Sequence, residues 1–122
     1  MSNAILQEYQ KQLGQAKTTE LWNIYKTETR DGLYSRLSRW VLQSEKDLLQ
    51  NFFHSRQAGG KTFGMKDFVL ACKQMEEHLQ AGGGIEIINS RLSHISELFE
   101  QEAKQVENIL NKKEPKNDKI DK

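Results

Sequence analysis

One stretch of the chain carries residues that could bind a phosphate or a metal ion. Gly59-Gly60-Lys61-Thr62 ends in the Gly-Lys-Thr of a phosphate-binding loop, but Ser55 stands where the first glycine of that loop belongs. The residues before it predict an amphipathic helix, whereas a phosphate-binding loop follows a strand. The wider segment 56–68 has the glycines and the closing acid, Asp67, of a calcium-binding loop, yet its early ligand positions hold no carboxylate. We therefore predict no metal site and no cofactor.

A second set of residues could do acid-base or nucleophilic chemistry. Ser90, His94 and Glu97 follow one another at one-turn spacing on a predicted helix. A hydroxyl, an imidazole and a carboxylate on one exposed face have no oxyanion site and nothing to exclude water. Cys72 lies among apolar positions of another predicted helix, which is typical of a buried thiol. The sequence thus predicts no catalytic residues, no small-molecule substrate and no enzyme.

A third set combines basic and aromatic residues, as nucleic-acid surfaces do. The basic residues are Arg30, Arg36, Arg39, Lys46 and Arg56, and Tyr34 and Trp40 lie among them. Trp40, however, shares an apolar stripe with Leu33 and Leu37, which favours burial over stacking on a base. The net charge of the chain is only +1, so no global field attracts a polyanion. A small nucleic-acid-binding regulator is therefore the alternative function, using the basic face of residues 30–56.

Length and composition narrow the class of protein. The 122 residues suit a single domain, and 36% hydrophobic with 29% charged residues suits surface-rich helices. No apolar run is long enough to cross a membrane, and the amino terminus has no basic region followed by an apolar stretch. The single cysteine cannot form an internal disulfide. We expect a cytoplasmic protein with no membrane partner.

Apolar residues recur at steps of three and four along most of the chain, which predicts helices. A short helix over 3–15 is followed by a second helix that starts near Thr18. The Asp31-Gly32 pair either breaks this second helix or leaves a weak point in a continuous rod. The clearest stripe begins at Leu33 and predicts one amphipathic helix of about 20 residues, which ends in the glycine-containing stretch 55–60.

Two further helices are predicted in the second half of the chain. Apolar positions from Met65 to Leu79 form one face, and Gly82-Gly83-Gly84 then turns the chain into an antiparallel neighbour. The last helix, 85–110, carries an almost heptad apolar seam of the coiled-coil type.

No strand pattern of useful length occurs, so the predicted fold is all-α. We expect a small antiparallel helical bundle of four helices, or five if the chain breaks at Asp31-Gly32. Residues 1–110 would form this single domain, and the charged residues 111–122 would be a disordered C-terminal tail.

Charge is distributed unevenly along the chain. Residues 26–66 hold eight basic and four acidic residues, whereas 76–110 hold seven acidic and two basic residues. Opposite charges favour packing of these two stretches against each other. A partner could supply either half instead.

The apolar residues predict a function in protein binding. Leu21, Trp22 and Tyr25 give the first arm aromatic and apolar surface that a partner could bury, although they could equally cover the open side of the bundle. The seam of the last helix offers Ile88, Leu92, Ile95 and Phe99. We predict a non-enzymatic interaction module: an adaptor, a chaperone-like binding subunit or a small component of a larger assembly. Another protein, or a second copy in a homo-oligomer, would complete the seam.

Overall fold

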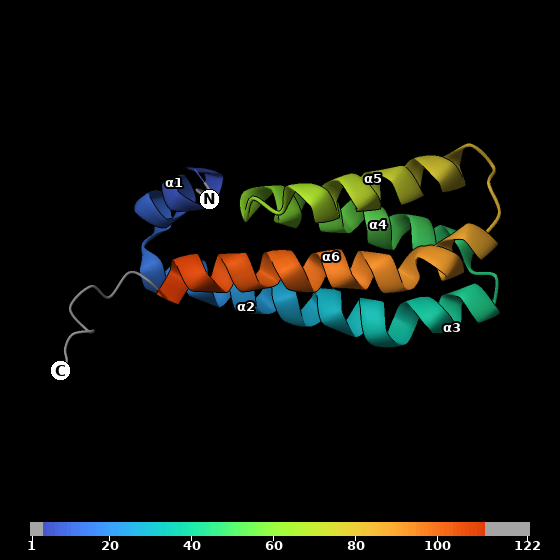
Figure 1. Cartoon of the computed structure of the whole chain (residues 1–122), viewed down its shortest axis with the longest axis horizontal. Helices are drawn as coiled ribbons and strands as arrows, with labels where there is room; N and C mark the ends of the chain where they lie inside the picture. The colour runs from blue at the N-terminus through green and yellow to red at the C-terminus, as the bar shows by residue number, and fades with distance from the viewer. Residues whose placement is uncertain (1–3, 112–122) are drawn as a thin grey trace.

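The computed structural model describes residues 4–111, and over this range it consists of helices and the turns between them (Figure 1). The elements are α1 (Ala4–Leu13), α2 (Gln15–Asp31), a π-helical turn η1 (Gly32–Arg36), α3 (Leu37–Leu42), α4 (Lys46–Thr62), α5 (Lys66–Gln80) and α6 (Glu86–Asn111). Because α2, η1 and α3 run on as one rod, this part of the chain has five helices. The all-α prediction is confirmed. The predicted tail lies, apart from Asn111, outside the described residues.

Four long helices form the antiparallel bundle: the rod, α4, α5 and α6 (Figure 1). The predicted reversal at the three glycines is present, with Gly82 at a φ of 87°. The His78 ring closes this turn through a 2.8 Å contact with the carbonyl oxygen of Gly84. Helix α1 lies across the opposite end of the bundle, where Tyr9 meets Phe63 edge to face at 6.1 Å between ring centroids.

The Asp31-Gly32 pair does not break the helix. The chain passes through Gly32 in helical geometry and widens to the π-helical turn η1. A Cβ atom at Gly32 would overlap the ring of Phe52 on α4. The glycine therefore permits close contact between the rod and α4.

The single helix predicted from Leu33 through Phe53 is wrong. The chain reverses between Leu42 and Lys46, and Ser44 takes a φ of 56° in this turn. Val41 and Leu48 are seven residues apart, which is about two helical turns. The apolar periodicity therefore continues through the reversal and gives no sign of it. The stripe belongs to two antiparallel helices, and Leu49 rather than Leu48 is the buried leucine of the second.

The predicted end of a helix at Gly59-Gly60 is also wrong. Helix α4 continues through both glycines to Thr62, and the reversal comes at Gly64, which has a φ of 71°. Gly60 is buried, and a Cβ atom there would lie 2.5 Å from Val69 Cγ2 of α5. Glycine is needed here for close packing of helices and not for a turn.

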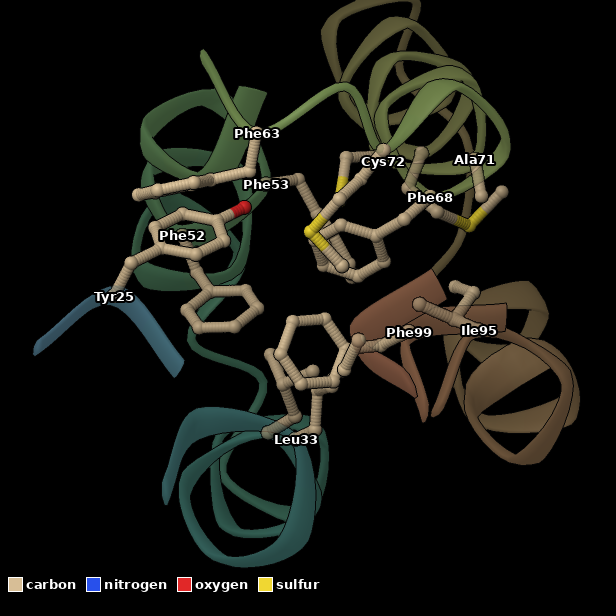
Figure 2. Packing of buried hydrophobic residues seen from close by; sticks show 14 of the residues in the cluster. Tyr25, Leu33, Phe52, Phe53, Phe63, Phe68, Ala71, Cys72, Ile95 and Phe99 are labelled. Carbon is tan, nitrogen blue, oxygen red and sulfur yellow. The ribbon is translucent and has the colours of Figure 1, made fainter. Parts of the chain in front are cut away.

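Aromatic side chains form the centre of the core. Figure 2 shows Tyr25, Phe52, Phe68 and Phe99 converging from α2, α4, α5 and α6. Phe99 is fully buried, with its ring centroid 5.0 Å from that of Phe68 and 6.4 Å from that of Trp22. Edge-to-face and offset aromatic pairs of this kind add to the stability gained by burial alone. All four helices of the bundle therefore share one core.

No helix in the described range combines the length and the apolar character needed to pass through a lipid bilayer.

Candidate functional site

The residues predicted to bind a partner lie largely in the core. Trp22 is 1% exposed, and Tyr25, Ile88, Ile95 and Phe99 are buried as well. Leu21 and Leu92 are partly buried and pack against the same core. In this structure the chain's own helices fill the apolar seam, and the aromatic residues of α2 cover the side of the bundle that would otherwise be open.

Polar groups of α2 are tied to α6 and α4. Trp22 donates a hydrogen bond from Nε1 to Glu107 at 3.0 Å, and Lys26 Nζ lies 2.7 Å from the same carboxylate. Tyr25 donates its hydroxyl proton to the carbonyl oxygen of Arg56 at 2.6 Å, and burial raises the pKa of this phenol well above its usual range. Helix α2 is therefore held by specific bonds as well as by apolar contact.

The basic residues of the nucleic-acid alternative are mostly paired within the chain. Arg30 donates two hydrogen bonds to Glu100, at 2.7 and 3.0 Å. Arg36 lies 2.9 Å from Asp31, and Arg56 donates to Thr29 at 3.1 Å and lies over the Tyr25 ring.

Arg39 is exposed and Lys46 is partly exposed at the far end of the rod and the start of α4. The structure thus does not gather the five basic residues into one unpaired surface.

Ion pairs between the rod and α6 match the predicted attraction between the basic and acidic stretches. They are Lys26 to Glu107 and Arg30 to Glu100. The hydrogen bonds from Arg30 lower the pKa of Glu100, and the Tyr34 hydroxyl adds a third bond at 3.0 Å. Partial burial opposes the ionised form of Glu107, but hydrogen bonds from Lys26 and Trp22 outweigh it and lower the pKa of Glu107.

The candidate catalytic groups do not share one pocket: His94 lines a groove between α5 and α6, and Glu97 lines a hollow between the rod and α6. Ser90, His94 and Glu97 are exposed on α6, and the Ser90 hydroxyl donates to the backbone carbonyl of Ile87 at 3.0 Å. Cys72 is buried, and burial raises the pKa of its thiol well above the usual range, so the reactive thiolate is disfavoured. Within residues 4–111 no three His, Cys, Asp or Glu side chains are grouped as metal ligands would be.

A groove between α5 and α6 is a surface that the sequence prediction missed. It encloses about 250 Å³. Its lining residues are Asp67, Leu70, Ala71, Gln74, Met75, Arg91, His94, Ile95 and Leu98. Ala71, Met75 and Ile95 are buried at its base, while Leu70 stands on its wall with 53% of its surface exposed.

A sequence signal for this groove exists. Leu70 and Leu98 are apolar residues just outside the main stripes of their helices, so each stripe is wider than one core contact requires. The sequence does not show that Leu70 and Leu98 lie on the same side of the bundle. That follows only from the packing of α5 against α6.

A wider and more polar hollow lies between the rod and α6. It encloses about 590 Å³. Its lining residues are Leu33, Tyr34, Ser38, Asn89, Leu92, Ser93, Ser96 and Glu97. Its exposed aromatic residue, Tyr34, is already hydrogen-bonded to Glu100. Polar atoms make up a larger share of the lining of this hollow than of the groove between α5 and α6.

No match was found to any protein-family model, curated protein or solved structure.

Proposed function

We propose that this protein is a non-catalytic protein-interaction module that binds a helix in the groove between α5 and α6. One observation carries the proposal: the half-exposed Leu70 stands beside a buried apolar base formed by Ala71, Met75 and Ile95. An adaptor or a small component of a larger assembly would act in this way. The single cysteine, buried and unpaired, supports a reducing cytoplasmic location.

The spacing of the lining residues supports a helical ligand. Residues 67, 70, 71 and 74 line one wall at helical steps, and 91, 94, 95 and 98 line the other. Each set covers about two turns, so the groove runs along both helices. A ligand helix with apolar residues at similar steps would present one continuous face to it.

Polar residues at the margins of the groove can set the position of the ligand. Asp67, Gln74, Arg91 and His94 all line it, around the apolar base. Interfaces commonly combine an apolar centre with such a polar rim. Burial of Leu70 would contribute about 1 kcal/mol or more of the binding free energy, because half of its surface is still exposed to water.

Of the seam residues Ile88, Leu92, Ile95 and Phe99, the groove includes Ile95, which is buried at its base. A partner that used Trp22 or Phe99 would first have to open the core, which costs most of the folding free energy of a small domain. Nucleic-acid binding has less support, because Arg30, Arg36 and Arg56 are engaged within the chain.

The proposal can be tested with a photo-crosslinking amino acid placed at position 70 in cells of the source organism. The matched control is position 42, because Leu42 is 85% exposed and is not among the residues that line the groove. We expect a protein adduct from position 70 and little from position 42. With the captured protein purified, Leu70→Glu should raise the dissociation constant at least about tenfold, and Leu42→Glu should leave it unchanged.

Equal crosslinking at both positions, or binding that survives Leu70→Glu, would contradict the proposal.

A further inference from the structure

We infer that the helix occupying the α5–α6 groove comes from a second copy of this chain, docked antiparallel about a two-fold axis. This inference rests on the proposed function and names the partner. It is carried by the charges at the two ends of the groove and by the shape of its wall.

The groove has an acidic end and a basic end. Asp67 lies in the first turn of α5, and its backbone N–H donates to the Glu102 carboxylate at 2.9 Å, which places Asp67 level with Glu102. Arg91, which also lines the groove, precedes Glu102 by eleven residues on α6 and therefore lies about 16 Å from it along the helix. Within the part of the chain that the structure describes, neither the Asp67 carboxylate nor the Arg91 guanidinium takes part in an ion pair.

A two-fold rotation exchanges these ends. The Asp67 carboxylate of one copy then faces the Arg91 guanidinium of the other, and the same pair forms again on the opposite side of the axis. The groove is thus complementary in charge to itself. A groove with the same charge at both ends would repel a second copy in this arrangement.

The wall of the groove fits the same arrangement. Leu70 projects half exposed beside the small Ala71, so two copies can each place Leu70 in the hollow of about 250 Å³ on the other. This is the knob-into-hole contact of paired helices. The net charge of +1 leaves little repulsion between two chains.

The first experiment is sedimentation equilibrium of the full chain over a series of concentrations. We expect a concentration-dependent dimer and no larger species, because a two-fold contact closes on itself. Leu70→Glu should raise the dimer dissociation constant at least about tenfold, because it buries a charge at the centre of the contact. Leu42→Glu, the matched control, should leave it unchanged.

A charge exchange tests the two-fold geometry. Asp67→Arg and Arg91→Asp should each weaken dimerisation, by about tenfold for two like-charge contacts per dimer. An equimolar mixture of the two variants should recover the affinity as a heterodimer, since both contacts then join opposite charges. Recovery on mixing cannot come from a change in the folding stability of either chain, and thermal melting by circular dichroism would show that each is folded.

A chain that stays monomeric at all concentrations would overturn the inference, as would a dimer unaffected by Leu70→Glu or a mixture that forms no heterodimer. The proposed function fails separately. If the crosslinker at position 70 captured a different protein, the groove would still be a binding site, but its occupant would not be a second copy. If the crosslinker captured nothing and the chain were monomeric, the proposed function and the proposed dimer would both be wrong.

Discussion

At the scale of single residues, small side chains decide how closely the helices approach. Gly59 and Gly60 lie inside α4, where the Tyr25 ring covers the first and Val69 touches the second. The Tyr25 hydroxyl bonds to Arg56 one turn earlier on α4, which holds the ring in this place. Glycines at these positions therefore serve the contact of α4 with α2 and α5.

Gly60→Ala should lower the free energy of unfolding by about 1–3 kcal/mol, because the new methyl group would collide with Val69 Cγ2. Without this collision, Gly60→Ala would stabilise the protein, because alanine favours a helix by about 1 kcal/mol over glycine. A gain in stability would therefore show that the close contact is absent. Urea denaturation followed by circular dichroism measures the change. In a Val69→Ala background the loss should be smaller, since the colliding atom is removed.

At the scale of elements, α6 caps the start of α5. Helix α5 has no side-chain cap of its own at Met65. Instead the Glu102 carboxylate of α6 accepts hydrogen bonds from the backbone N–H groups of Asp67 and Phe68, at 2.9 and 2.8 Å. Partial burial raises the pKa of Glu102, although these two bonds oppose the rise. Since α5 and α6 also form the proposed groove, this cap fixes its acidic end.

Glu102→Ala should destabilise the protein by about 1–2 kcal/mol, the usual cost of losing an N-terminal helix cap. Glu102→Gln, which keeps one acceptor oxygen, should lose less. The neighbouring Gln101→Ala is the control, because Gln101 is exposed. Urea denaturation gives the global loss, and hydrogen exchange of the Asp67 and Phe68 amides gives the local one. A loss no larger than that of the control would contradict the cap.

At the scale of the whole molecule, opposite charges align the first and last long helices. Arg30 and Lys26 on α2 pair with Glu100 and Glu107 on α6. Each such partly exposed pair contributes at most about 1 kcal/mol. Their main effect is therefore to favour this antiparallel pairing over others.

The pairing predicts a loss of stability in acid. Because hydrogen bonds from Arg30 lower the pKa of Glu100, the folded protein binds this proton less readily than the unfolded chain. The stability that the pair contributes is present above the ordinary glutamate pKa of about 4.3 and is lost as the pH falls through the lower folded value. Urea midpoints should therefore decline less steeply below about pH 4.3 in Glu100→Gln than in the wild type.

Glu97→Gln is the control for this measurement, because Glu97 lies one turn away and is exposed. Glu102, whose pKa is raised in the folded protein, has the opposite effect. Its contribution to the free energy of unfolding decreases as the pH rises through its folded pKa. Identical pH profiles for wild type and Glu100→Gln would mean that the Arg30 pair does not act in solution.

Local patterns in the sequence were sufficient for the fold class and for several boundaries. Apolar steps of three and four predicted the helices that became α1, α5 and α6, and the three consecutive glycines predicted the turn between the last two. These features depend on interactions between residues close in sequence, so the sequence alone contains them. The buried faces of α5 and α6 follow from the same periodicity.

Tertiary structure decided what depends on neighbours distant in sequence. The reversal at Ser44 was hidden because the apolar period spans it, and Gly60 could not be recognised as a packing position before α5 lay beside α4. Whether Trp22 faced a partner or the core depended on Phe99, 77 residues away. The groove lined by Leu70 and Leu98 exists only where α5 and α6 meet. Burial and groove shape depend on how two helices pack against each other, whereas apolar periodicity is a property of a single helix.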